Sequence, residues 1–252
     1  MNNINSLYCT EIYESGFPAK MTDGLFRIGG LSLTKRFADA CAFNEGSIVI
    51  DIGCGNGMTV EYLRDQYRLQ TAGIDLSAVL LGQGKERLQN LNLIQAESEL
   101  LPFAAETADG VISECSLSVM QYSDRTLAEI NRILIPKGKL CISDVYIRNQ
   151  EGAAALRRIK CSGCISGALT FNELKQKLRD NGFIILKMED QSVLLKDFTA
   201  RLIMDCGSIK PYWNLISCTE ENRLFIWDTI IKARIGYYWL IAEKNSMGVC
   251  HE

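Results

Sequence analysis

Two groups of residues in this 252-residue sequence have the types and the spacing that binding or catalysis requires. The first is the run Val49-Ile-Asp-Ile-Gly-Cys-Gly-Asn-Gly57, in which glycines at 53, 55 and 57 follow Asp51. Glycine lets the backbone turn tightly and approach a ligand where a Cβ would clash. The N–H groups at the start of a following helix favour an anionic group such as a carboxylate. The run therefore predicts a loop that binds a small ligand.

The second group is Cys161-Ser-Gly-Cys164, the one C-x-x-C pair in a chain with ten cysteines. A structural zinc site needs four ligands, but the sequence has no second such pair, and its single histidine, His251, is the penultimate residue. A thioredoxin-type redox pair opens a helix directly after a strand, whereas Cys161 follows the basic run Leu-Arg-Arg-Ile-Lys. We therefore expect no metal site. One interpretation of the pair is that these thiols are buried and inert.

The spacing of the glycines separates two classes of cofactor. A dinucleotide-binding loop has the pattern G-x-G-x-x-G, and its third glycine would fall at Met58. The pattern here is G-x-G-x-G, which disfavours a nicotinamide-dependent dehydrogenase. Asp75 lies eighteen residues beyond Gly57, at the end of an expected strand. A carboxylate at that position can accept both hydroxyls of a ribose.

These residues need a sheet to position them, and short β-rich runs alternate with helical patterns along the chain. Residues 58–67 and 124–134 have helical patterns, and Thr170-Phe-Asn-Glu173 has the form of a capping box that starts another helix. The alternation predicts an α/β fold with a doubly wound, mostly parallel seven-stranded sheet whose last strand is antiparallel. The strands are expected at residues 47–53, 71–76, 91–97, 109–114, 139–147, 183–189 and 235–244.

The composition restricts the classes of partner. A net charge of −3 with no block of Lys and Arg gives no electrostatic footprint for nucleic acid. The N-terminus lacks the basic start and apolar run of a signal peptide. The most apolar late stretch, 224–244, is interrupted by Asp228, Lys232 and Arg234, which argues against a membrane span. We expect a cytoplasmic protein that acts on a small molecule, and its oligomeric state is left open.

Four blocks of the sequence resemble the class I S-adenosylmethionine-dependent methyltransferases. They are the glycine loop with Asp75, then residues 97–103, 108–113 and 134–144, and they span roughly residues 45–190 in the family's order. Two positions depart from the family pattern, because Glu97 replaces the usual aspartate and Pro136-Lys-Gly138 replaces Pro-Gly-Gly. The resemblance implies a Rossmann-like enzyme that uses S-adenosyl-L-methionine to methylate a small molecule.

The resemblance also implies roles for individual residues. The glycine loop would hold the methionine part of the cofactor, and Asp75 would accept the ribose hydroxyls. Leu76 would pack on the adenine, while Glu97 and Ser98 would meet its amino edge. The full set of expected cofactor-binding residues is Asp51, Gly53, Cys54, Gly55, Gly57, Asp75, Leu76, Glu97, Ser98 and Ser113.

Catalysis depends on the acceptor. An oxygen or nitrogen acceptor needs a general base, whereas a soft acceptor such as sulfur or arsenic needs none. Glu114 and Asp144, at the C-terminal ends of two expected strands, are the carboxylate candidates for that base. A purely structural role at the strand end is the other interpretation of Asp144.

A second resemblance concerns the cysteines. The segment Gly163-Cys-Ile-Ser-Gly-Ala-Leu169 is similar to arsenite methyltransferases, although residues 24–34 do not match that family and its cysteine pair near the glycine loop is missing. The similarity implies that Cys164 and Cys206 hold a soft acceptor such as arsenite, with Cys161 or Cys115 as a further ligand. Two alternatives stay open. One is an O-, N- or C-methyltransferase with structural cysteines, and the other is a non-catalytic S-adenosylmethionine-binding protein.

No internal repeat, low-complexity tract or linker divides the sequence. We expect one methyltransferase domain over residues 45–252, with a helical segment, 190–235, inserted before the last strand. Residues 1–44 are expected to form a helical lid over the cofactor.

Overall fold

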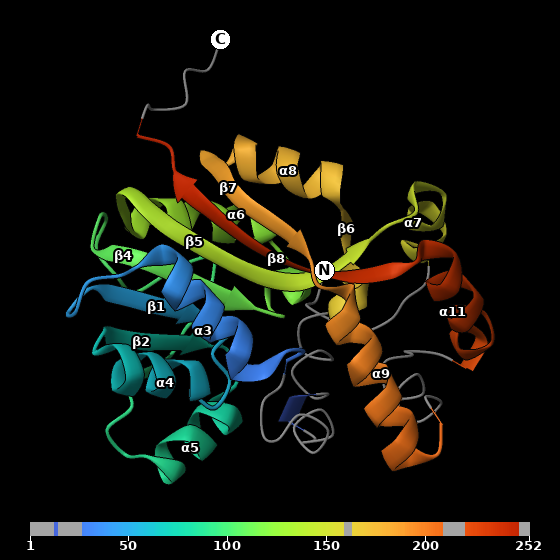
Figure 1. The fold of residues 1–252 in the computed structure, drawn as a ribbon, viewed down its shortest axis with the longest axis horizontal. Helices are drawn as coiled ribbons and strands as arrows, with labels where there is room; N and C mark the ends of the chain where they lie inside the picture. The colour runs from blue at the N-terminus through green and yellow to red at the C-terminus, as the bar shows by residue number, and fades with distance from the viewer. Residues whose placement is uncertain (1–12, 15–26, 159–162, 209–219, 247–252) are drawn as a thin grey trace.

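The computed structural model describes residues 13–14, 27–158, 163–208 and 220–246. Within them one sheet contains eight strands in the order β3-β2-β1-β4-β5-β8-β7, with β6 paired to β5 (Figure 1). The pairs are parallel except that β8 runs antiparallel to both β5 and β7. The strands are β1 (Ile48–Ile52), β2 (Gln70–Asp75), β3 (Leu93–Gln95), β4 (Ala108–Glu114), β5 (Leu134–Ile147), β6 (Leu169–Thr170), β7 (Phe183–Asp190) and β8 (Ile235–Lys244).

This sheet confirms the predicted α/β class, the mostly parallel pairing and the antiparallel last strand. Two details differ from the sequence-based expectation. The additional strand β6 has two residues, which is too short for an alternating pattern to reveal it. In addition, β5 begins at Leu134 and not at Lys139. Leu134 already pairs with Ala108, and the register then shifts so that Lys139 pairs with Gly110.

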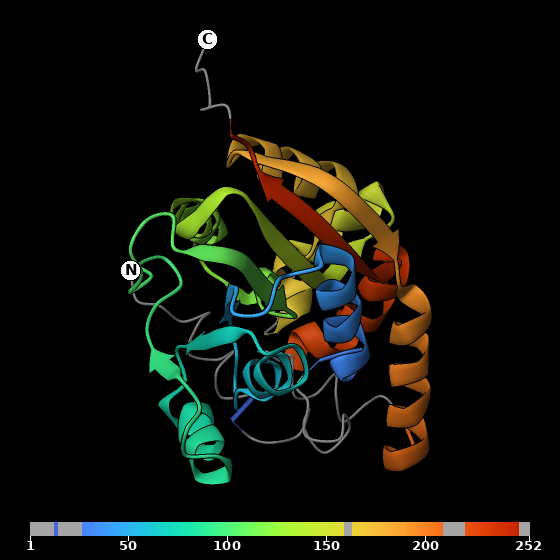
Figure 2. The same cartoon turned by 60° about the vertical axis from the view of Figure 1, so that its left-hand side comes forward.

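Helices cover both faces of the sheet (Figure 2). Val49 of β1 belongs to a buried cluster that also contains Phe37 and Trp239, whose rings stack with centroids 4.8 Å apart. Its neighbour Ile50 points to the opposite face, into a cluster with Leu127. The described helices are α3 (Gly30–Cys41), α4 (Met58–Tyr67), α5 (Ala78–Arg87), α6 (Ser123–Ile133), α7 (Gln150–Leu156), α8 (Phe171–Asp180), α9 (Ser192–Cys206) and α11 (Glu220–Ala233), with 3-10 turns η1 (Leu117–Val119) and η2 (Cys164–Gly167).

Local sequence sets where these helices begin. The helix α4 starts directly after Gly57, whose φ of 77° only glycine adopts readily. The Oγ of Ser77 accepts a hydrogen bond from Leu80 N at 3.1 Å and so caps α5. The predicted capping box is confirmed, because Thr170 and Glu173 exchange hydrogen bonds at the start of α8. The N-termini of α4 and α5 therefore follow the carboxyl ends of β1 and β2.

The order of the strands reverses between β1 and β4, since β2 and β3 lie on one side of β1 while β4 and β5 lie on the other. In doubly wound sheets, ligands bind at this point of reversal, beyond the carboxyl ends of the strands. The fold therefore places the glycine loop and Asp75 where a ligand is expected.

The expected division into domains stays a prediction. Residues 1–12 and 15–26, most of the expected lid, lie outside the described residues, and α3 packs on the sheet. The expected insertion 190–235 contains α9 and α11 among the described residues. No described helix is both long enough and apolar enough to cross a membrane.

Candidate functional site

A cavity of about 270 Å³ lies at the reversal of strand order, beyond the ends of β1, β2 and β4. Seven of the predicted site residues line it, and these are Gly53, Gly55, Asp75, Leu76, Glu97, Ser98 and Glu114. The wall also contains Tyr13, from the expected lid, and residues that sequence reasoning missed, among them Ser116, Met120, Tyr122 and Arg125. The structure therefore brings together residues from five separate segments of the chain.

The glycine loop is shaped by left-handed backbone. Gly53, Gly55 and Gly57 have φ angles of 77°, 52° and 77°, which glycine adopts without a Cβ penalty. The N–H of Gly53 donates to Ile74 O at 2.8 Å and joins the loop to β2. A Cβ on Gly53 would lie 2.4 Å from the Cβ of Ser116. The close approach of the loop to the segment after β4 therefore requires glycine.

Asp75 ends β2 and lines the cavity. Its Oδ2 accepts a hydrogen bond from Gly55 N at 2.7 Å, and its Oδ1 accepts one from Ser77 N at 2.8 Å. Burial raises the pKa of this carboxyl, and the two N–H groups partly oppose the shift. A carboxylate has about four lone-pair directions, so acceptor capacity remains for hydroxyl groups of a ligand. This set of acceptors fits a ribose.

The wall next to Asp75 combines an apolar side chain with acceptors. Leu76 is 46% exposed although it is apolar. Glu97 and Ser98 follow β3 in the same wall, and Ser98 Oγ lies 2.9 Å from Thr126 Oγ1. An apolar surface beside carboxylate and hydroxyl groups suits a flat base with an amino edge. The residues of the cavity therefore suit all three parts of S-adenosylmethionine: the glycine loop suits its methionine part, Asp75 its ribose, and the wall beside Leu76 its adenine.

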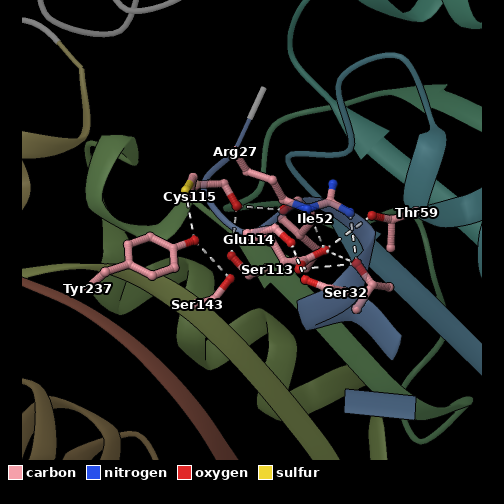
Figure 3. Close-up of polar contacts among 12 residues, drawn as sticks. Arg27, Ser32, Ile52, Thr59, Ser113, Glu114, Cys115, Ser143 and Tyr237 are labelled. Atoms are coloured by element: carbon pink, nitrogen blue, oxygen red, sulfur yellow. Dashed lines mark hydrogen bonds and ion pairs between the residues drawn. The ribbon is translucent and has the colours of Figure 1, made fainter. Parts of the chain in front are cut away.

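Glu114 is buried at the end of β4, and both of its oxygens already have partners (Figure 3). Thr34 Oγ1 lies 3.2 and 3.0 Å from the two oxygens, and Thr59 Oγ1 donates to Oε2 at 3.1 Å. The Nε of Arg27 lies 3.1 Å from Oε2, at ion-pair distance. Burial raises the pKa of Glu114, whereas Arg27 and the two hydroxyls oppose the shift.

Four predicted cofactor residues are buried in or beside the loop and do not line the cavity; these are Asp51, Cys54, Gly57 and Ser113. Burial and the charge of Glu114 raise the pKa of Asp51 to about 8, against the attraction of Arg27. Cys54 fills the space left by Gly73, where a Cβ would lie 2.6 Å from the Cys54 sulfur. Their roles in cofactor binding stay predictions, and the contacts favour support of the loop.

Asp144 also lies outside the cavity wall. Its Oδ2 accepts a hydrogen bond from Ser118 N at 2.9 Å, and its Oδ1 accepts bonds from Ser118 Oγ at 2.7 Å and Val145 N at 2.8 Å. Burial raises its pKa to about 6, and these three donors oppose the shift. The arrangement favours the structural interpretation, because the carboxylate ties η1 to the end of β5.

Among the described cysteines, Cys115 lines the cavity. Its sulfur lies 3.0 Å from Tyr237 Oη, which donates to Ser143 Oγ at 3.1 Å, so the thiol is the donor to the tyrosine oxygen. Cys164 lines a smaller, separate cavity of about 40 Å³ among apolar side chains such as Val145 and Leu202. The side chains of Cys161 and Cys206 lie outside the described residues.

The two cysteine-bearing segments are in direct contact. A Cβ on Gly167 of η2 would lie 1.9 Å from the carbonyl oxygen of Ser118 in η1. The turn that contains Cys164 therefore packs on the segment that follows Cys115.

Comparison with known proteins gives the family. Residues 50–142 match the methyltransferase-domain family. An uncharacterized methyltransferase, YodH, of Bacillus subtilis (strain 168) is 35% identical over 173 residues, which are 67% of this chain and 72% of that protein. The chain therefore belongs to the class I S-adenosylmethionine-dependent methyltransferases, and S-adenosyl-L-methionine is its cofactor.

Two further similarities are informative. The arsenite methyltransferase of Halobacterium salinarum is 26% identical over 220 residues, which cover 84% of this chain and 54% of that protein. The structure of phosphoethanolamine N-methyltransferase 2 of Haemonchus contortus with S-adenosyl-L-methionine has a TM-score of 0.68 at 16% identity, over 94% of this chain and 57% of that one. This chain thus spans little more than half the length of both proteins. The structural likeness shows the fold alone.

Proposed function

We propose that this enzyme transfers the methyl group of S-adenosylmethionine to a soft small-molecule acceptor, a thiol or a trivalent metalloid such as arsenite. One observation carries the proposal. Glu114 and Asp144, the carboxylates predicted as general bases, are both engaged by protein groups, and a cysteine, Cys115, is among the residues that line the cavity.

The chemistry of methyl transfer explains why the engagement of both carboxylates favours a soft acceptor. The bound cofactor supplies a methyl group that is already activated by its sulfonium, so the protein must mainly align the acceptor with it. An oxygen acceptor, or a protonated amine, must also lose a proton to a base. A thiolate or trivalent arsenic has an available lone pair. The two carboxylates predicted as the base are both bonded to protein groups, which suits the second kind of acceptor.

Sulfur ligands would hold such an acceptor, because soft donors bind soft centres. Cys115 is the described thiol in the cavity wall, and Cys164 lies in the turn packed on the next segment. Cys206 keeps the role implied by the sequence resemblance, as a residue at the end of α9. The similarity to proteins named arsenite methyltransferases, at 26% and 29% identity over 84% of this chain, supports this proposal.

The test measures S-adenosylhomocysteine formation by the purified protein with and without arsenite, in excess glutathione. Cofactor binding is measured on the same sample by calorimetry. The variants are Cys115→Ser and Cys164→Ser, with Cys41→Ser as the matched control, because Cys41 is a partly buried cysteine at the end of α3 that does not line the cavity.

We expect arsenite-dependent turnover. It should fall by at least about tenfold in Cys115→Ser and Cys164→Ser, which corresponds to a loss of roughly 1.4 kcal/mol of transition-state stabilisation. It should persist in Cys41→Ser. Turnover of an amine or alcohol, unaffected by the serine variants, would instead identify an N- or O-methyltransferase. Cofactor binding with no turnover of thiol, metalloid, amine or alcohol would favour the non-catalytic alternative.

A further inference from the structure

The run Arg27-Ile-Gly-Gly-Leu-Ser-Leu-Thr34 belongs to the part of the sequence that matches no methyltransferase block. Its glycine pair turns the chain, since Gly29 and Gly30 have φ angles of 82° and 51°. A Cβ on Gly29 would lie 2.6 Å from Leu33 Cδ1. The turn brings Arg27 back beside Thr34, where Nη2 of Arg27 donates to Thr34 Oγ1 at 2.8 Å.

This turn delivers Arg27 and Thr34 to Glu114. Together with Thr59 they form a buried polar group, here called the Glu114 cluster (Arg27, Thr34, Thr59 and Glu114). The side chains of Arg27 and Glu114 are 10% and 2% exposed, and Thr34 and Thr59 are 0% and 1% exposed. Figure 3 shows Arg27 and Thr59 directed at Glu114 from different elements.

The charges in the cluster must be balanced inside the protein. A buried carboxylate is costly unless an opposite charge or several donors accompany it. Glu114 and the neighbouring Asp51 are both buried, at 6% and 4% exposed, and the nearby cation that lowers the pKa of both is Arg27. Removing Arg27 would therefore leave a buried carboxylate uncompensated next to the glycine loop.

The cluster also holds the loop mechanically. Thr59 is the second residue of α4, two positions after the loop's last glycine, and its hydroxyl is bonded to Glu114. At the other end of the loop, Ser116 Oγ donates to Ile52 O at 2.8 Å. The carboxyl end of β4 therefore contacts the loop at both of its ends, and Arg27 and Thr34 secure one of these contacts.

We propose that Arg27 and Thr34 are positioning residues for the cofactor: acting through Glu114, they hold the first turn of α4, and with it the glycine loop, in the conformation that binds S-adenosylmethionine. Glu114 then links the segment 27–34 to the first turn of α4. The inference concerns cofactor binding, so it holds whatever the acceptor is.

The experiment measures the dissociation constant of S-adenosylmethionine by calorimetry on the full chain, and the melting temperature without cofactor. Thr34→Val keeps the shape of the side chain and removes the hydroxyl, whereas Thr34→Ser keeps the hydroxyl. Arg27→Gln removes the cation. Arg36→Gln is the matched control. Arg36 lies on α3, as Thr34 does, but it pairs with Glu189 at 2.7 Å and does not line the cavity.

Because each change removes an interaction with a charged group, we expect Arg27→Gln and Thr34→Val to raise the dissociation constant at least roughly tenfold, with Thr34→Ser and Arg36→Gln within about twofold. If Arg27 acts through Glu114, the double variant Arg27→Gln/Glu114→Gln binds no more weakly than Arg27→Gln alone.

Two results would overturn the proposal. In one, Arg27→Gln lowers the melting temperature while the folded protein binds the cofactor with unchanged affinity, which would show a merely structural role. In the other, Thr34→Val and Thr34→Ser bind the cofactor equally well. The second comparison stays decisive even if Arg27→Gln does not fold, because the threonine variants add no buried charge.

Discussion

The substitution Gly53→Ala tests whether the close contact between the glycine loop and the segment after β4 is essential. The φ of Gly53 is +77°, and a Cβ there would lie 2.4 Å from Ser116 Cβ and 2.8 Å from Ser116 Oγ. Ser116 cannot easily give way, because its hydroxyl donates to Ile52 O and lies 2.8 Å from Ser113 Oγ. Either the loop or the segment must move.

The magnitude follows from two costs. A left-handed backbone costs a non-glycine residue about 1–2 kcal/mol, and overpacking a tight contact typically costs about 1–3 kcal/mol. The free energy of unfolding should therefore fall by about 2–5 kcal/mol. Affinity for S-adenosylmethionine should fall as well, since the displaced loop is the part that the family resemblance assigns to the methionine end of the cofactor.

Urea unfolding of four variants, Gly53→Ala, Ser116→Gly, their double variant and Gly46→Ala, separates the two costs. Gly46→Ala is the control for backbone strain, because Gly46 has a φ of +83° and nothing within 4 Å of its virtual Cβ. The double variant Gly53→Ala/Ser116→Gly removes the obstructing atoms and should lose less stability than the sum of the two single changes. The reasoning would be refuted if Gly53→Ala proved no more destabilising than Gly46→Ala.

Two further predictions concern carboxylates. Asp75→Asn should weaken S-adenosylmethionine binding at least about tenfold by calorimetry, because an amide cannot accept from Gly55 N and Ser77 N on both of its atoms; unchanged affinity would contradict this. The pKa of Asp144 is raised from 3.8 to about 6, so the folded state keeps a proton that the unfolded chain releases, and stability falls as pH rises from about 4 to 6. At about 1.36 kcal/mol per unit the loss is at most about 3 kcal/mol, and urea unfolding should show a shallower decline over this range in Asp144→Asn than in the unmodified protein.

Local patterns were sufficient to predict most of the fold. The helix α4 has the predicted bounds, and α8 begins at the predicted capping box, because both depend on residues within a few positions of each other. The strand β6 could not be predicted in this way. Its two residues form a strand only because the chain passes beside Tyr146 and Ile147 at the end of β5.

The same distinction applies to the site. Gly53, Gly55 and Asp75 were found because the loop and the end of β2 carry local motifs, and the structure places them in one cavity wall. The partners of Glu114 were missed, because Thr59 and Thr34 lie 55 and 80 residues away from it in sequence. A carboxylate at a strand end looks available for proton transfer until the fold supplies its partners.

Those partners change how the end of β4 is understood. Between Ser113 and Ser116, neighbouring residues contact different elements: Glu114 reaches α3 and α4, Cys115 reaches Tyr237 on β8, and Ser116 reaches Ile52. Cys115 has a φ of 53°, which is unusual for a residue other than glycine. Strained backbone persists only where the surroundings over-determine it, and such residues cluster at functional sites. Because this short segment contacts the glycine loop and itself contains Cys115, it would position both the cofactor and the proposed acceptor ligand.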